Sequence, residues 1–209
     1  MCGVFGYLSR GGRPNLDRLR RIALVTETRG RHAFGMAWID ANGGIGTWKR
    51  PGPAGGSLDA LELVRDAVLI LGHCRYATNG DPTANENNHP HRAGRGWIVH
   101  NGTVRNHRLL ARRYDLEPRG ECDSEVLGLL LAKLGGKLET RAKLAMDLAV
   151  GDMAILGLWN DPVRLLVAKA GKPLHCGKLA ADLYLASLPM GLPGKVYSVR
   201  DGWAGVLAV

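Results

Sequence analysis

The chain has 209 residues, of which 45% are apolar and 22% charged, a composition that allows one well-buried domain and leaves little room for a second. No apolar stretch reaches the roughly 18 residues that cross a bilayer, and the first twenty residues lack the pattern of a secretion signal, so we expect neither membrane insertion nor secretion. Lysine and arginine total 28 against 19 acidic residues, a formal net charge of +9. That excess raises nucleic acid as a partner.

The positive charge is concentrated near the N-terminus, where residues 1–50 carry nine basic and three acidic side chains. Base stacking would require aromatic side chains among the arginines, and none lies between Tyr7 and Phe34. We therefore interpret this segment as a solvated helix face and consider nucleic-acid binding a poor explanation. The arginines concerned are Arg10, Arg13, Arg18, Arg20, Arg21, Arg29 and Arg31.

The four cysteines are far apart in the sequence and form neither a C-x-x-C pair nor the spacing of a zinc site. Isolated cysteines of this kind fit a protein of the reducing cytoplasm. They are Cys2, Cys74, Cys122 and Cys176.

Glycine and proline divide the first half of the chain into short segments with apolar runs. In order, they predict a strand over Val4–Ser9, a helix from Leu16 to about Thr26 with Asn15 as its N-cap, a strand over Gly35–Ile39, a helix over Leu58–Ala67 capped by Ser57, and strands over Val68–Tyr76 and Trp97–Asn101.

The second half begins with helices and ends with strands. A short helix begins at Asn106, and two more run from Asp123 to Leu134 and from Leu138 to about Val150, ending before Gly135-Gly136 and Gly151. Strands are predicted over Met153–Trp159, Val163–Ala168, Asp182–Ser187, Val196–Arg200 and Gly205–Val209. Many strands with helices grouped between them predict an α+β fold of antiparallel sheets layered with helices.

The longest irregular stretch is 80–96, which is rich in asparagine and nearly free of apolar residues. A loop of that length inside a compact domain is usually functional or disordered. His89 and His91 within it could be a metal-binding pair, but the sequence offers no evident third ligand.

Residue 2 is a cysteine, and initiator methionine is removed when the second residue is small, so we expect the mature chain to begin with Cys2. The thiol and a free α-amine would then belong to one residue. An α-amine has a pKa of about 7.7–8.0, so it is partly neutral at cell pH and can accept the proton of the thiol. Taken alone, however, a cysteine at position 2 is more simply explained as an accident of the start site.

Three further segments add the groups that attack on a side-chain amide would need. Arg75 follows an apolar strand and offers a planar fork of donors to a carboxylate. Asn101 followed by Gly102 supplies an amide N–H and an unobstructed backbone N–H, which is a workable oxyanion hole. Asp123, at the start of a helix, could pair with an ammonium group.

Each segment also has a purely structural explanation. Arg75 could form a surface ion pair, Asn101-Gly102 a type I′ hairpin turn, and Asp123 an N-cap. Singly, these explanations are favoured. Together, a nucleophile, a carboxylate clamp, oxyanion donors and an ammonium partner are much less easily explained by chance.

In these motifs the sequence resembles the glutaminase domain of class II glutamine amidotransferases, which are N-terminal nucleophile hydrolases, and it is most like that of glucosamine-6-phosphate synthases. The resemblance runs in order along the chain. It is carried by Cys2-Gly3-Val4-Phe5-Gly6, Arg29-Gly30 before Gly35, Gly72 to Gly80, His89-Pro90-His91, His100-Asn101-Gly102 with Asn106, Asp123-Ser124-Glu125, Gly151-Asp152-Met153-Ala154 and Leu185-Ala186-Ser187.

The resemblance implies hydrolysis of L-glutamine through a γ-glutamyl thioester on Cys2, with the oxyanion held by Asn101 and by the N–H of Gly102. It further implies that the glutamine carboxylate is gripped by Arg75 with help from Thr78, and that the α-ammonium is bound by Asp123. The site residues implied are therefore catalytic Cys2, Asn101 and Gly102, and substrate-binding Arg75, Tyr76, Thr78 and Asp123.

The sequence departs from the pattern of glucosamine-6-phosphate synthases at several positions near these motifs. Cys74 stands in place of threonine, Tyr76 in place of tryptophan and Asn79 in place of histidine. Tyr76 keeps an amphipathic ring, so that change looks tolerable. His32-Ala33 replaces an acidic-then-small pair, which puts in doubt any contact that the acid makes.

The resemblance also implies a four-layer αββα sandwich and neither a cofactor nor a metal. We expect residues 1–209 to be a single glutaminase domain without a synthase domain, in the cytoplasm, so that ammonia would pass to a separate synthase subunit. The basic N-terminal segment would then be a candidate docking face, and a homo-oligomer is also considered. Two alternatives remain open: a stand-alone hydrolase of a γ-glutamyl amide in a larger metabolite, and a non-catalytic regulatory or binding subunit.

Overall fold

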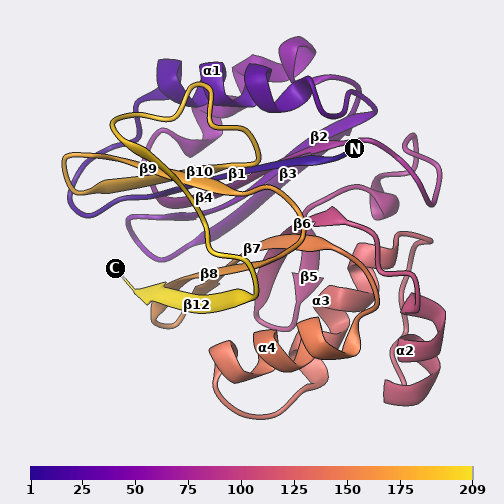
Figure 1. Cartoon of the computed structure of the whole chain (residues 1–209). Helices are drawn as coiled ribbons and strands as arrows, with labels where there is room; N and C mark the ends of the chain where they lie inside the picture. Colours follow the sequence, from indigo (N-terminus) through magenta and orange to yellow (C-terminus); the bar gives the residue numbers. More distant parts are fainter. Residues whose placement is uncertain (209) are drawn as a thin grey trace.

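Two antiparallel β-sheets lie face to face in the computed structural model, which describes residues 1–208 (Figure 1). The seven-stranded sheet has the order β11-β9-β10-β1-β4-β2-β3, and the five-stranded sheet the order β12-β8-β7-β6-β5. The strands of the first are β1 (Gly3–Leu8), β2 (Ala33–Asp40), β3 (Ile45–Pro51), β4 (Ala67–Arg75), β9 (His175–Leu179), β10 (Asp182–Ala186) and β11 (Val196–Ser198). Those of the second are β5 (His91–Ala93), β6 (Gly96–Gly102), β7 (Met153–Asn160), β8 (Val163–Ala170) and β12 (Trp203–Ala208).

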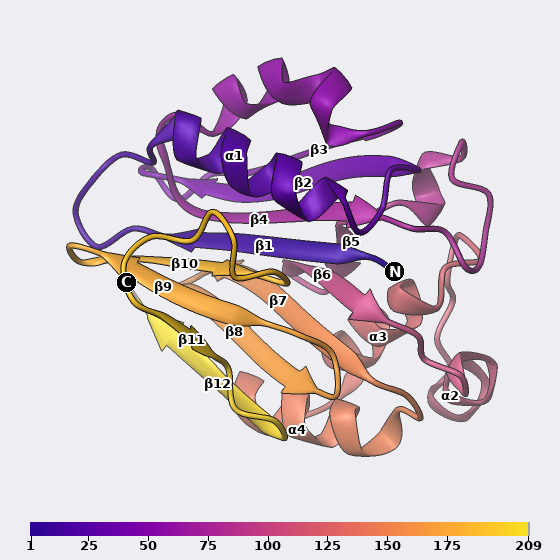
Figure 2. The same ribbon diagram turned by 45° about the horizontal axis from the view of Figure 1, so that its top comes forward.

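Helices cover the outer face of each sheet, which gives the four layers αββα (Figure 2). α1 (Leu16–Glu27) and the 3-10 segment η1 (Ala54–Val64) cover the seven-stranded sheet. α3 (Asp123–Lys133) and α4 (Leu138–Leu148) cover the five-stranded sheet, and α2 (His107–Tyr114) packs against α3 at its rim. The α+β sandwich expected from the sequence is confirmed.

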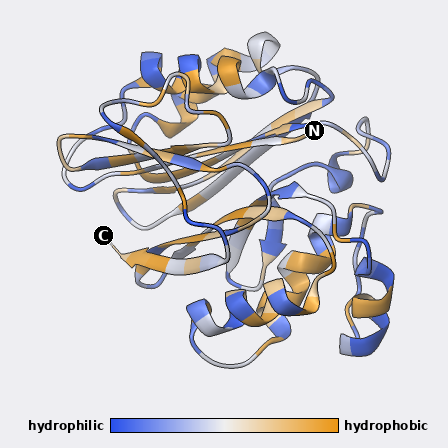
Figure 3. Ribbon diagram, viewed as in Figure 1, coloured by the Kyte–Doolittle hydropathy of each residue, from blue (hydrophilic) through white to orange (hydrophobic). Residues whose placement is uncertain are grey.

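Three apolar layers hold these elements together. Between the sheets, Val4 and Leu71 pack against Leu156. Phe5, on the other face of β1, belongs to the layer between the seven-stranded sheet and its helical cover of α1 and η1. Ile155, on β7, belongs to the layer between the five-stranded sheet and the helices α3 and α4. Because both faces of the central strands are buried, β1, β4 and β7 appear in the sequence as nearly continuous apolar runs. Figure 3, coloured by hydropathy, shows that the central strands are largely hydrophobic and that α2 is largely hydrophilic.

The predicted strands all have counterparts whose bounds differ by at most two residues, with Val209 outside the described residues. Three strands, β3, β5 and β9, were not predicted from the sequence. Their segments contain few apolar residues, because β3 and β5 are edge strands and β9 lies near the sheet edge with exposed side chains. The stretch 80–96 is accordingly not irregular throughout, since it holds the 3-10 turn η2 (Asn85–Asn87) and β5.

The helix predicted over Leu58–Ala67 was wrong in type and bounds. η1 begins at Ala54, and Ser57 lies inside it with φ −144° and ψ 27° rather than capping it. The kink at Ser57 divides the 3-10 segment, and Ala67 already belongs to β4. The prediction for α1 is confirmed, since Asn15 Oδ1 accepts a hydrogen bond of 2.8 Å from the Arg18 N–H.

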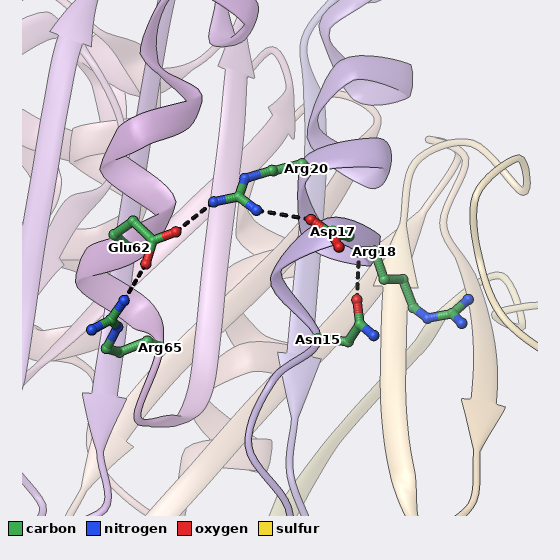
Figure 4. Close-up of polar contacts among 6 residues, drawn as sticks. All are labelled: Asn15, Asp17, Arg18, Arg20, Glu62 and Arg65. Carbon is green, nitrogen blue, oxygen red and sulfur yellow. Dashed lines mark hydrogen bonds and ion pairs between the residues drawn. The ribbon is translucent and has the colours of Figure 1, made fainter.

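Several arginines of the basic N-terminal segment are paired with acids on α1 and η1. Arg20 forms ion pairs with Asp17 and with Glu62, and Glu62 also pairs with Arg65 (Figure 4). Such exposed pairs add little stability, but they reduce the charge available to a polyanion and support the interpretation as a solvated helix face. Further pairs join Arg13 to Asp66 and Arg31 to Glu27.

None of the helices in residues 1–208 combines the length and the apolar character that a membrane crossing requires.

Candidate active site

Cys2 lies directly before β1, and its side chain is held by the backbone of Tyr76, the residue after β4. Its thiol donates to the Tyr76 carbonyl oxygen and accepts from the Tyr76 N–H, both at 3.3 Å. The Cys2 carbonyl oxygen in turn accepts a 2.7 Å hydrogen bond from Arg29 Nε at the end of α1. The residue after β4 and the segment after α1 therefore both hold Cys2 in place at the N-terminal end of β1.

The chain passes closely around this position, and two glycines permit it. A Cβ on Gly3 would lie 2.5 Å from Thr26 Cγ2, and one on Gly30 would lie 2.4 Å from the carbonyl carbon of Arg75. No side chain fits at such separations, so α1 and the residues after it can approach the ends of β1 and β4 only because these residues are glycine.

Arg75 is the last residue of β4 and is buried. Nη1 donates to Asn88 Oδ1 at 2.8 Å, and Nη2 donates to the carbonyl oxygens of Asn79 and Gly80. No carboxylate in residues 1–208 forms an ion pair with it, so the surface ion pair considered from the sequence is not formed. A buried guanidinium with only neutral partners can still take an anionic ligand.

Asn101 and Gly102 end β6 opposite β7. Asn101 is 1% exposed, and its Nδ2 has no hydrogen-bond partner among the described residues. A Cβ on Gly102 would lie 2.1 Å from the Asp152 carbonyl oxygen, so only glycine fits there. The chain continues toward α2 instead of turning back, so these two residues are not a hairpin turn. A buried amide N–H without a partner is available to a developing oxyanion.

Asp123 is the first residue of α3, whereas Cys122 is the N-cap, so the N-cap explanation of Asp123 is not what the structure shows. Its buried carboxylate accepts a hydrogen bond from the Val104 N–H through Oδ2. This bond ties the start of α3 to the segment that follows Gly102. The carboxylate therefore lies beside the end of β6, where it can take a cationic group.

The strand register gathers these residues at one end of the sandwich. Gly3 pairs with Cys74 in antiparallel β1 and β4, so Cys2 and Arg75 emerge at the same end. His73 Nε2 lies 3.0 Å from the His100 carbonyl oxygen, which links β4 to β6 across the sheets just before Asn101. Figure 2 shows this end of the molecule, with the N-terminus close to β6 and α3.

Charges and burial determine the protonation of the thiol and the nearby histidines. Burial raises the pKa of the Cys2 thiol, whereas the Tyr76 N–H and the positive charges of the N-terminus and Arg75 lower it. Burial also lowers the pKa of His73 to about 3 and that of His100 to about 4, so both imidazoles are neutral at pH 7. Within residues 1–208 no imidazole hydrogen-bonds the Cys2 thiol.

The two remaining predicted site residues, Tyr76 and Thr78, differ in whether they contact the other site residues. Tyr76 contributes its backbone to the thiol, while its exposed ring stacks on His32 with centroids 5.0 Å apart. His32 also accepts from the Ala77 N–H at 2.9 Å, so the residue that departs from the family pattern supports the turn after β4. Thr78 is exposed, and no hydrogen bond joins it to Arg75 in the described part of the chain.

Sequence reasoning missed two residues that shape this end. Arg29 anchors the Cys2 backbone, and Asn88 orients Arg75 while its Nδ2 donates to the Pro82 carbonyl oxygen at 2.8 Å. The Asn-rich composition of the loop was the available signal for Asn88. For Arg29 the available signal was the Arg29-Gly30 motif of the resemblance, to which no role was assigned.

A scan against protein-family models finds no match. Among curated proteins, the chain is similar to the glutamine–fructose-6-phosphate aminotransferase (isomerizing) of Gluconobacter oxydans, with 37% identity over 205 residues, 90% of this chain and 32% of the relative. The protein of the same name from Sulfurisphaera tokodaii is 32% identical over 226 residues, 99% of this chain and 37% of the relative. The chain thus spans about a third of the length of the curated relatives it matches.

Among solved structures, the fold is similar to glutamine phosphoribosylpyrophosphate amidotransferase from B. subtilis, with a TM-score of 0.77 at 22% identity. The match covers 99% of this chain and 49% of that one, and at this identity it shows the fold. The order of motifs along the chain agrees with two findings: the sequence similarity to glutamine–fructose-6-phosphate aminotransferases, and the αββα sandwich. The chain is therefore a class II glutamine amidotransferase domain.

Proposed function

We propose that this domain hydrolyses L-glutamine to glutamate and ammonia, with Cys2 as the nucleophile. The observation that carries the proposal is the meeting of three groups at one end of the sandwich: the Cys2 thiol, the buried Arg75 guanidinium and the unpartnered Asn101 amide. These are a nucleophile, an anion-binding group and an oxyanion donor, which amide hydrolysis of a free amino acid requires.

In the proposed reaction, removal of Met1 leaves the α-amine on Cys2. Met1 is 65% exposed, which suits its removal. The amine takes the thiol proton as sulfur bonds to the side-chain amide carbon, and the oxyanion accepts hydrogen bonds from Asn101 Nδ2 and Gly102 N–H. The same proton passes to the leaving nitrogen as the C–N bond breaks, and ammonia departs. Water then adds to the thioester, the C–S bond breaks, and glutamate and the thiol are released.

For binding, we propose that Arg75 takes the α-carboxylate of glutamine and Asp123 its α-ammonium. Both side chains are buried and ionic, and neither pairs with an opposite charge among residues 1–208. A zwitterionic ligand would supply both missing charges. Tyr76 and Thr78 are proposed to line the entrance on the basis of their exposed side chains next to Cys2.

We further propose that residues 1–209 act as one glutaminase domain and that the ammonia is used by a separate synthase subunit. The curated relatives are named aminotransferases and match over a third of their length, so their acceptor chemistry belongs to parts that this chain does not match. A catalytic thiol works only when reduced, and the four free cysteines suit a reducing compartment such as the cytoplasm.

Glutamate release by the purified chain tests the glutaminase proposal. Activity on glutamine should fall at least about a thousandfold in Cys2→Ala, as expected for loss of a nucleophile. Cys176→Ser, a matched change at a half-buried thiol on β9, should leave it unchanged. An electrophilic glutamine analogue, 6-diazo-5-oxo-norleucine, should label Cys2 alone among the four cysteines.

Two other outcomes would contradict the proposal. Activity restricted to γ-glutamyl conjugates would indicate a hydrolase of a larger metabolite. Absence of any activity and of labelling, in a protein shown by intact mass to begin with Cys2, would indicate a non-catalytic subunit. The synthase proposal is tested separately by co-purification, where recovery of the chain without an aminotransferase or isomerase partner would count against it.

A further inference from the structure

A second cluster of reactive side chains lies beside the proposed glutamine site. His89, His91 and Cys122 each offer one ligand atom, and these three atoms all lie within 4.8 Å of one another. All three residues are buried. The sequence presented only the two histidines as a pair, because Cys122 is more than thirty residues further along the chain.

Specific contacts bring the two segments together. Asn87 Oδ1, two residues before His89, accepts a 2.7 Å hydrogen bond from the N–H of Glu121, the residue before Cys122. α3 also approaches β5 closely, since a Cβ on Gly128 would lie 2.4 Å from the Arg92 carbonyl oxygen. Cys122 is therefore held next to the histidines by a hydrogen bond from its neighbour Glu121 to the Asn87 side chain and by close packing of α3 on β5.

The backbone of His89 is held from the opposite side as well. Lys49 Nζ on β3 donates to the carbonyl oxygens of Asn88 and Pro90 at 2.7 and 3.3 Å. Gly35 on β2 allows the His89 carbonyl to approach, because a Cβ there would lie 2.1 Å from that oxygen. His89 is thus positioned through its main chain, and these contacts do not involve its imidazole ring.

The ring nitrogens of the two histidines, in contrast to the main chain, lack most of their hydrogen bonds among the described residues. Both nitrogens of His89 and Nε2 of His91 are buried without a hydrogen-bond partner among the described residues. His89 instead stacks on His73 with centroids 3.8 Å apart and meets His91 edge-on at 4.4 Å. Buried polar atoms are almost always paired in proteins, so three unpaired nitrogens around one thiol call for a ligand.

Charged groups around the cluster act in both directions. Lys49 and Arg75 oppose a cation, although burial lowers the pKa of Lys49. Asp123 favours a cation, whereas burial and this carboxylate raise the pKa of the Cys122 thiol to about 11, so a metal must displace the thiol proton when it binds. Cys122 is the N-cap of α3, and the positive end of the helix favours a thiolate there. Burial keeps both imidazoles neutral, which is the form that binds a metal.

We propose that His89, His91 and Cys122 form a binding site for a borderline-soft divalent metal ion, Zn²⁺ in the first place. Two imidazoles and one thiolate are a ligand set that Zn²⁺ uses with water in the fourth position. On binding, the metal displaces the Cys122 thiol proton, which passes to solvent, and forms Zn–S and Zn–N bonds. The proposal does not depend on the glutaminase activity.

The geometry requires only a small adjustment. In a Zn²⁺ tetrahedron with Zn–S of about 2.3 Å and Zn–N of about 2.0–2.1 Å, sulfur and nitrogen lie about 3.6 Å apart. From separations of at most 4.8 Å, the ligand atoms need to close by about 1 Å, within reach of side-chain rotation. The bound metal would join the loop that carries Asn88, the partner of Arg75, to the start of α3, which carries Asp123.

Cobalt titration tests the site directly, because Co²⁺ bound by a thiolate in a tetrahedral site gives a sulfur-to-metal charge-transfer band in the near ultraviolet. The full chain is used as Cys2→Ala, since an N-terminal cysteine can itself chelate a metal. After treatment with a chelator, this protein is expected to bind about one Co²⁺ per chain with that band, and Zn²⁺ should displace it.

Variants then assign the band. In the Cys2→Ala background, Cys122→Ser should abolish the charge-transfer band, and His91→Gln should weaken binding by about tenfold or more. Cys176→Ser is the matched control and should change neither. A Cys2→Ala protein that gives no thiolate band overturns the proposal whatever the variants do, as does a band that survives Cys122→Ser in a cooperatively folded protein.

Discussion

The Cys2 thiol is held at 3.3 Å from both the backbone nitrogen and the carbonyl oxygen of Tyr76, so its hydrogen bonds are to the backbone that directly follows β4 and not to a side chain. Tyr76 directly follows Arg75, whose guanidinium is anchored in the next loop. The proposed nucleophile and the proposed carboxylate clamp are therefore fixed by adjacent residues of one strand end. Changes to side chains around the thiol are expected to alter chemistry or binding more than they displace the sulfur.

Asn101→Ala should lower kcat for glutamine about 10²–10³-fold with little change in KM, because the amide N–H acts on the oxyanion and not on the ground state. Steady-state glutamate release measures it. Asn42→Ala, in the exposed turn between β2 and β3, is the control and should have no effect. An unchanged kcat in Asn101→Ala would remove this residue from the proposed oxyanion hole.

Arg75→Ala should raise KM for glutamine by about 30-fold to 1,000-fold, which corresponds to about 2–4 kcal/mol for a charge-assisted bidentate hydrogen bond. Arg75→Lys keeps the charge but loses the fork, so it should recover only part of the affinity. Asn88→Ala removes a partner of Arg75 and leaves the guanidinium, so its effect on KM should be smaller. Equal KM values in Arg75→Ala and the unmodified protein would contradict the role.

Protein that retains Met1 should lack glutaminase activity, because the free α-amine then lies one residue from the thiol and burial raises the pKa of that thiol. Intact mass separates the two forms, and active-site labelling counts the competent fraction. The labelled fraction should equal the fraction that begins with Cys2. Full activity in a sample composed only of the Met1 form would show that another group is the base.

The environment of Tyr7 leads us to expect that the free energy of unfolding falls at high pH. Its hydroxyl donates to Asp182 Oδ2 at 3.0 Å, and burial together with this carboxylate raises the pKa of Tyr7 above its ordinary value near 10. Above pH 10 the unfolded chain loses the proton that the folded chain keeps, so the free energy of unfolding should fall by about 1.4 kcal/mol per pH unit from this group. Urea unfolding between pH 9 and 11 checks this. Tyr7→Phe should show a shallower decline, and parallel curves would contradict the assignment.

Asn15→Ala should lower the free energy of unfolding by about 1 kcal/mol, because it removes the side-chain acceptor of the Arg18 N–H at the start of α1. Asn15→Asp keeps an acceptor and should remain close to the unmodified protein. Urea denaturation measures both, and glutaminase activity should be unchanged because Asn15 lies at the N-terminal end of α1, whereas Thr26 and Arg29, which approach the Cys2 segment, lie at the C-terminal end. Identical midpoints for Asn15→Ala and Asn15→Asp would show that the cap contributes nothing.

The local pattern of the sequence was sufficient where burial is continuous. β1, β4 and β7 were predicted within two residues because both their faces are buried, and α1 because its cap and apolar stripe agree. Edge strands β3 and β5 were missed because edge strands carry few apolar residues, and η1 was mistaken because it is a 3-10 segment kinked at Ser57.

The sequence by itself determined the residue types available for chemistry: a cysteine at position 2, an arginine after an apolar strand and an asparagine before a glycine. Only the tertiary structure decided which of them meet. The antiparallel register of β1 with β4, and the contact of His73 with the His100 carbonyl, together bring Cys2 to the same end of the sandwich as Asn101, about a hundred positions further along the chain. Cys122 beside His89 and His91 is the same case, because packing of α3 on β5 creates a proximity that no sequence spacing encodes.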